Sequence, residues 1–102
     1  MKEAKDCRNI QEIREAIDEI DHQILTSFGK RLEYVKEIVK FKTDPNGIVA
    51  RDRQLELLKK RREWAAESGL DPDLFEEIYK TLINWNVQKE LELFREKENT
   101  TI

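Results

Sequence analysis

Four charged residues lie at core-facing positions of the helices that this sequence predicts. Arg14, Arg31 and Lys42 interrupt the apolar side of one long amphipathic segment, and Glu90 interrupts the apolar side of another. A buried charge is costly unless a counter-charge pairs with it, so three inward-facing cations require an anion. That anion could be a carboxylate of the protein or a bound ligand, and the spacing of the cations favours a ligand.

The three cations cannot all meet within one straight helix. Arg31 and Lys42 are eleven residues apart, and at about 100° per residue they share one helix face. Arg14 precedes Arg31 by seventeen residues, which corresponds to roughly 25 Å at about 1.5 Å per residue. If all three bind one small anion, we expect Arg14 to come from a second copy of the chain, in a homodimer.

Two further polar residues extend this candidate site. Arg53 opens the second predicted helix, and Asn86 lies one turn before Glu90. If the chain between the first two helices folds back, Arg53 and Glu90 converge with Arg31 and Lys42. Several cations with one carboxyl suit a small dicarboxylate, because arginine holds a carboxylate through two parallel hydrogen bonds.

Each of these charges also has a purely structural explanation. Carboxylates about one turn away could pair with the basic side chains, and long basic side chains can reach solvent from an apolar face. The candidate partners are Asp18, Asp21, Glu33 and Glu37. Glu90 could be exposed near a frayed helix end. The basic run Lys59–Arg62 is flanked by Glu56 and Glu63, which is typical of a solvated helix face.

Three helices of unequal length must position these residues. Asn9 with Glu12, and Asp71 with Pro72, are typical helix starts, and Gly69 suits the position just after a helix end. The segment Thr43–Gly47 is the strongest helix breaker and predicts a mobile loop over residues 43–49. The predicted helices span about residues 10–41, 50–68 and 72–96. No segment alternates with the period of a strand, so we expect an all-α fold.

Composition bounds the domain and its partners. The chain has 102 residues, of which 38% are hydrophobic, and we expect one domain over residues 1–102. A first helix of roughly 48 Å is long beside a radius of gyration of about 13 Å for a compact domain of this size, which favours an intertwined oligomer. A net charge of −3, with both signs interspersed, favours neither nucleic acid nor a membrane as partner.

The cysteine and histidine contents limit the chemistry further. Cys7 is the single cysteine, which rules out an internal disulfide bond and is compatible with a reducing cytoplasm. His22 is the single histidine, and the chain has no thiolate cluster, so we expect no metal site. Any chemistry must therefore rely on positioning and electrostatics.

At these residues the chain resembles a known family. Ile13–Asp21, Gly29–Lys36 and Phe41–Lys42 are similar to the first helix of the all-helical chorismate mutase family. Within it, the chain most resembles the isochorismate pyruvate lyase branch. That likeness extends to Asp6-Cys7, Arg61, Trp64-Ala65, Gly69–Asp71 and Ile83–Trp85.

The resemblance implies an intertwined homodimer of three-helix chains with two active sites. Each site would bind isochorismate or chorismate, both small dicarboxylates, and would run a pericyclic reaction without a cofactor. Arg31 and the second chain's Arg14 would hold carboxylates, and Lys42 would donate to the ether oxygen. The implied site consists of Arg14, Arg31, Val35, Lys42, Arg53, Leu57, Ile83, Asn86, Val87 and Glu90, with Lys42, Glu90 and Arg31 as catalytic residues.

Two positions depart from the family pattern. Lyases usually carry Gln at position 90, and here a carboxyl would have to be protonated to donate to the ether oxygen. Mutases commonly carry Glu where this chain has Gln54, which disfavours an efficient mutase. The departure at Glu90 counts against a lyase and the one at Gln54 against a mutase. The resemblance along the chain implies the lyase activity, with weak mutase activity. The alternatives are a chorismate mutase and a non-enzymatic helical dimerisation module, in which protein carboxylates would pair with the cations.

Overall fold

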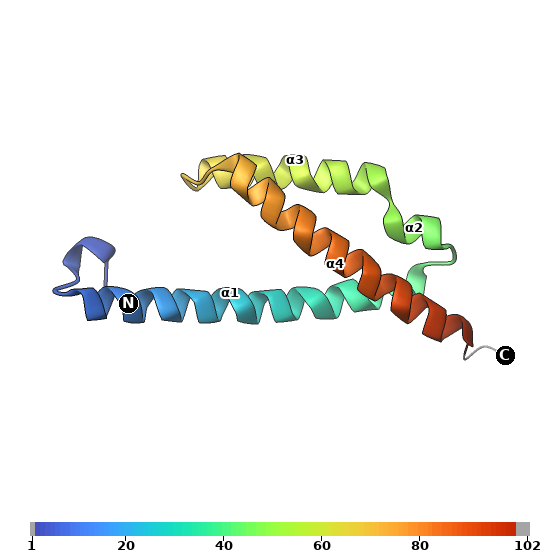
Figure 1. Cartoon of the computed structure of the whole chain (residues 1–102), viewed down its shortest axis with the longest axis horizontal. Coiled ribbons are helices and arrows are strands. Elements are labelled where there is room, and N and C mark those ends of the chain that lie inside the picture. The colour runs from blue at the N-terminus through green and yellow to red at the C-terminus, as the bar shows by residue number, and fades with distance from the viewer. Residues whose placement is uncertain (1, 100–102) are drawn as a thin grey trace. The chain divides into compact units, whose positions relative to one another are not determined.

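The computed structural model describes residues 2–99, and all regular structure within that range is helical (Figure 1). The elements in chain order are η1 (Ala4–Asp6), α1 (Ile10–Ile38), η2 (Val39–Phe41), α2 (Pro45–Val49), α3 (Arg51–Glu67) and α4 (Pro72–Asn99). The prediction of an all-α fold with three main helices is confirmed. The expectation of one long and two shorter helices is wrong, because α4 with 28 residues is nearly as long as α1 with 29. The prediction of a loop over residues 43–49 is wrong, because α2 occupies most of it.

Local signals explain where α1 begins. The Asn9 side chain accepts a hydrogen bond of 2.9 Å from the Glu12 backbone N–H, and the Glu12 carboxylate accepts one of 2.9 Å from the Arg8 N–H. Lys2 pairs with the same carboxylate at 3.1 Å. The Arg8 N–H and then Lys2 hold the pKa of Glu12 below its ordinary value. The predicted helix start at Asn9 is confirmed.

The turn between α3 and α4 follows a known capping pattern. The Leu70 N–H donates to the Ala65 carbonyl at 2.8 Å, and the Gly69 N–H donates to the Ala66 carbonyl at 3.1 Å. This pair of hydrogen bonds requires a residue with a left-handed backbone just after the helix, and Gly69 supplies it with φ of 74°. The Asp71 side chain then accepts from the N–H of residue 73 at 3.0 Å and starts α4.

The chain divides into two compact units, residues 1–34 and 35–102. The first unit holds η1 and most of α1, whose apolar stripe is exposed in the single chain. The exposed stripe residues are Ile10, Ile13, Ile17, Ile20 and Ile24, which are 43–62% exposed. Such a continuous apolar stripe is unusual on a monomer surface.

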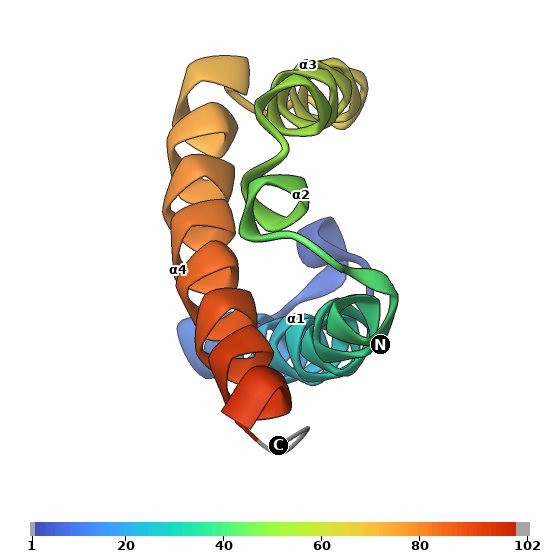
Figure 2. The same cartoon turned by 90° about the vertical axis from the view of Figure 1, so that its right-hand side faces the viewer.

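The second unit is built around α4. This helix packs against α3, α2 and η2 (Figure 2). Val39, Ile48 and Phe94 form a buried cluster, with Val87 and Leu91 packed against it. The cluster joins η2 and α2 to the C-terminal half of α4.

Candidate active site

The inward face of α4 carries a polar pair within an apolar row. Ile83, Asn86, Glu90 and Phe94 are all buried, and Glu90 is 8% exposed. Their spacing of three and four residues places them on one side of the helix, as the sequence predicts. The alternative in which Glu90 is exposed at a frayed end is wrong. Asn86 and Glu90 both have interaction partners in the structure.

Lys42 lies where the first long helix gives way to α2. Its backbone is extended, with φ of −95° and ψ of 134°, and its N–H donates to the Val39 carbonyl at 3.2 Å. A Cβ atom placed on Gly47 would be 3.6 Å from Cδ of Lys42, so the half-buried lysine stem runs beside α2. Asp44 caps that short helix by accepting from the Asn46 N–H at 2.8 Å.

Ala50 joins α2 to α3 with a left-handed backbone, φ 38° and ψ 64°. Its N–H donates to the Asn46 carbonyl at 3.0 Å, and its own carbonyl accepts from the Gln54 N–H at 3.0 Å. One residue therefore ends one helix and starts the next. The Gln54 side-chain amide also donates a hydrogen bond to the Val49 carbonyl at the end of α2.

A hollow of about 520 Å³ lies between α3 and α4. Arg51, Gln54 and Leu58 line it from α3, and Asn84, Val87 and Gln88 line it from α4. Of the predicted site residues only Val87 is among those that line this hollow. The sequence interpretation missed Arg51, Asn84 and Gln88, although their spacing places them beside the predicted faces of α3 and α4.

The structure distributes the predicted site residues over both units. Arg14 and Arg31 belong to residues 1–34, where Arg14 is exposed and Arg31 is half-buried with an interaction partner. The other eight belong to residues 35–102: Val35, Lys42, Arg53, Leu57, Ile83, Asn86, Val87 and Glu90. Arg53 is exposed on the first turn of α3. The convergence of the cations in one site stays a prediction.

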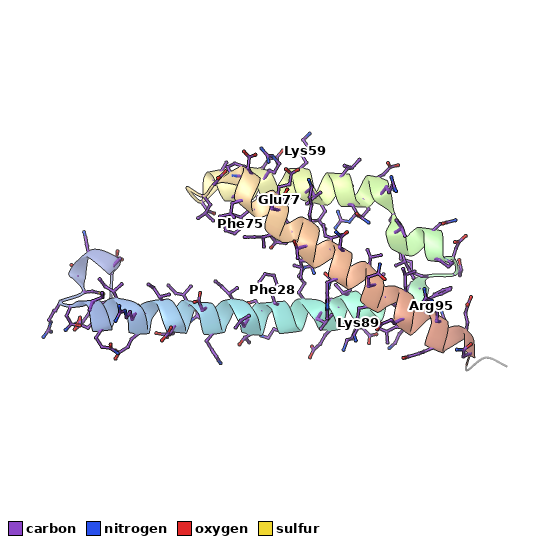
Figure 3. The ribbon with its side chains drawn as sticks, in the orientation of Figure 1. Phe28, Lys59, Phe75, Glu77, Lys89 and Arg95 are labelled. Carbon is purple, nitrogen blue, oxygen red and sulfur yellow. The ribbon has the colours of Figure 1, made fainter. Side chains whose placement is uncertain are left out.

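The basic run on α3 has two sides. Lys59 points away from α4, as a solvated face requires (Figure 3). Arg62 instead donates to Asp73 at 2.8 Å and to Glu76 at 3.2 Å, and the hydrogen bond to Asp73 is the main cause that raises the pKa of Arg62. Arg61 stacks over Trp64 with 4.6 Å between its guanidinium carbon and the ring centroid. Lys59 and Lys60 are exposed, as the predicted solvated face requires, whereas Arg61 and Arg62 are half-buried. Arg62 links α3 to α4, and Arg61 stacks on a ring of its own helix.

Residues 2–99 contain neither a candidate metal site nor a candidate membrane-spanning helix. No cluster of three or more His, Cys, Asp or Glu side chains has the arrangement of a metal site within that range. None of the helices described there combines the length and the apolar character that crossing a bilayer requires.

Comparison with known proteins identifies the family. Residues 13–91 match the chorismate mutase type II family. The chain is similar to an isochorismate pyruvate lyase from Pseudomonas aeruginosa, with 36% identity over 96 residues that cover 94% of this chain and 95% of that protein. It is also similar to a T-protein from Haemophilus influenzae, with 33% identity over 70 residues that cover 68% of this chain and 19% of that protein. The chain therefore belongs to the chorismate mutase type II family.

Proposed function

We propose that this protein is an isochorismate pyruvate lyase that forms salicylate and pyruvate without a cofactor and has weak chorismate mutase activity. The observation that carries this proposal is the similarity to a lyase over nearly the whole length of both chains. The similarity to the T-protein covers only a fifth of that larger protein, so it carries less information about the activity of this chain.

The proposed chemistry is a concerted rearrangement within the substrate. The ether C–O bond of isochorismate breaks while a hydrogen moves from the neighbouring ring carbon to the enol methylene, which becomes the methyl group of pyruvate. The ring is left as salicylate, so atoms and electrons balance without a co-reactant. Negative charge develops on the ether oxygen, and Lys42 is the group proposed to stabilise it.

The anionic ends of the substrate need separate partners. Arg31 and the second chain's Arg14 are proposed to hold the two carboxylates of the small dicarboxylate substrate. Arg53 assists near α2, and Val35, Leu57, Ile83 and Val87 wall the ring. The exposed isoleucine stripe of α1 supports the homodimer that this sharing requires, because a second copy would cover it.

Glu90 and Asn86 supply polar atoms on the buried face of α4. A protonated Glu90 carboxyl can donate a hydrogen bond to the ether oxygen, whereas the carboxylate can only accept. The proposal therefore requires a neutral Glu90 in the active form. The single cysteine of the chain fits a reducing compartment, and we place the enzyme in the cytoplasm.

A chorismate mutase is the second candidate, and the family match supports it. The position of Gln54 argues against an efficient mutase. By resemblance, mutases use a Glu here to receive the ring hydroxyl, whereas the Gln54 amide donates to the Val49 carbonyl. A carboxylate could not make that hydrogen bond.

Separate incubations of the purified protein with isochorismate and with chorismate test the proposal. We expect salicylate fluorescence to rise with isochorismate, and chorismate absorbance to fall much more slowly with chorismate. The matched control is Lys42→Ala, which should lose both activities. Faster consumption of chorismate would favour the mutase, and consumption of neither substrate would favour the dimerisation module.

A further inference from the structure

Lys97, near the C-terminal end of α4, holds the backbone at the end of the first long helix. Its Nζ donates to the carbonyl oxygens of Val39, Lys40 and Lys42 at 3.4, 3.4 and 3.1 Å. A lysine ammonium carries three N–H donors, and three carbonyls lie around this one. Each of the three N–H donors therefore has a carbonyl within reach.

One of the three carbonyls, that of Val39, also accepts from the Lys42 N–H at 3.2 Å. The carbonyls of Lys40 and Lys42 lie at the end of η2, where the last carbonyls of a helix lack a partner within the helix. The partial negative charge of a helix C-terminus also attracts a cation. Lys97 thus supplies hydrogen-bond donors to these groups although it follows them by 55 to 58 residues in the sequence.

The donor itself sits on a fixed support. The Lys97 ammonium lies 5.8 Å from the ring centroid of Phe94, which is 3% exposed. Phe94 belongs to the buried cluster with Val39 and Ile48. The lysine therefore connects the backbone of η2 to the best-buried part of α4.

We propose that Lys97 is a positioning residue for Lys42. The Lys42 carbonyl and side chain share one Cα atom, so a hydrogen bond that holds the carbonyl also fixes the direction in which the side chain leaves the backbone. The Lys42 stem then runs beside Gly47, and its ammonium reaches the substrate from a defined origin. This inference rests on the proposed role of Lys42 at the ether oxygen.

The test compares three variants by steady-state kinetics with isochorismate. Lys97→Met removes the ammonium and keeps an unbranched apolar stem. We expect kcat to fall about tenfold or more, with KM changed less than about twofold, because a small misplacement of Lys42 acts mainly in the transition state. Lys97→Arg keeps a charged donor and should recover most of the lost kcat. Lys80→Met is the control on the same helix, where Lys80 makes an exposed pair with Glu77 at 3.7 Å, and it should keep the parent kcat.

Amide hydrogen exchange gives a second readout that needs no substrate. Lys97→Met should speed exchange in residues 39–49, and exchange in α3 should stay unchanged. If that variant fails to fold, Lys97→Gln, which keeps two N–H donors without the charge, should show a smaller loss of kcat in the same direction. A Lys97→Gln variant with the parent kcat would overturn the inference.

The outcomes separate this inference from the proposed function. An active parent whose Lys97→Met variant keeps the parent kcat, while Lys42→Ala loses it, overturns the positioning role alone. A Lys97→Met variant that melts earlier but keeps kcat and KM below its melting temperature overturns it too, because the residue would then serve stability only. A parent inactive on both substrates overturns the proposed function and this inference with it.

Discussion

Replacing Glu90 by Gln tests the most unusual residue of the candidate site. Glu90 is 8% exposed on the face of α4 that also buries Asn86. The proposed lyase needs a hydrogen-bond donor to the ether oxygen there, and a carboxyl donates only in its neutral form. Gln has nearly the same shape and donates at every pH. The substitution therefore keeps a hydrogen-bond donor at this position and removes its loss by ionisation.

The expected change in kcat with pH follows from the neutral fraction of Glu90. Above the pH at which the carboxyl ionises, the neutral fraction falls about tenfold per pH unit, which corresponds to about 1.4 kcal/mol. The total loss is bounded by the value of one such donor, roughly 10²- to 10³-fold in kcat. The parent kcat should thus decline with rising pH toward a low plateau. The Glu90→Gln enzyme should have a flat profile and should equal or exceed the parent at neutral pH.

The assay is kcat for isochorismate at pH 5, 6, 7 and 8, followed by salicylate fluorescence. Glu92→Gln is the matched control, because it removes a carboxylate from the same helix at a side chain that is 60% exposed. This control should keep the parent profile. A parent profile that is already flat, or a Glu90→Gln enzyme that declines like the parent, would refute the role of Glu90 as the titrating donor.

Four further predictions follow from the fold and from the proposed shared site. Ala50→Gly should raise the free energy of unfolding by up to about 1 kcal/mol, because it relieves a left-handed alanine with φ of 38°. Gly69→Ala should lower the free energy of unfolding by about 1 kcal/mol through backbone strain alone, since an added Cβ meets nothing within 4 Å. Urea unfolding at one protein concentration measures both variants, and shifts in the same direction would contradict these predictions. The lowered pKa of Glu12 stabilises the fold above about pH 4.5, and this contribution is lost as the pH falls through the pKa of the folded state. Glu12→Gln should therefore reduce the dependence of the free energy of unfolding on pH at acid pH. An unchanged dependence would contradict this prediction. Arg14→Ala and Lys42→Ala chains, each inactive alone, should regain activity when unfolded and refolded together, and verified heterodimers without activity would exclude a shared site.

Local signals allowed most of the helix boundaries to be predicted from the sequence. Asn9, Gly69 and Asp71 act through hydrogen bonds to residues within five positions, so their effect can be read without knowledge of the fold. The burial of Glu90 was also predictable, because its spacing from Ile83 and Phe94 follows the helix period.

The segment around Pro45 shows where local signals are ambiguous. Proline and glycine end helices, and the segment Thr43–Gly47 therefore predicts a loop when it is considered alone. Proline is equally suited to the first turn of a helix, and here Pro45 is the first residue of α2 and Asp44 caps that helix. Packing of Ile48 into the core decides between the two outcomes, and that contact is not visible in a local window.

Contacts between distant residues could not be predicted at all. Lys97 follows its three acceptor carbonyls by 55 to 58 residues, and no spacing rule connects them. The left-handed backbone of Ala50 was missed for a related reason, since alanine carries no signal for that conformation and the two flanking helices impose it. The proposed sharing of Arg14 with the other cations would require a second chain, which the single sequence indicates only through the distance between Arg14 and Arg31.

The origin of the hydrogen in the pyruvate methyl group tests the central claim most directly. The purified protein should be incubated with isochorismate in D₂O with a metal chelator, and the pyruvate reduced to lactate as it forms so that later exchange with solvent is avoided. An intramolecular transfer predicts salicylate and a product methyl group that carries three protons and no deuterium. One solvent deuterium in each product methyl group would contradict the proposed mechanism, and the absence of salicylate would contradict the proposed function.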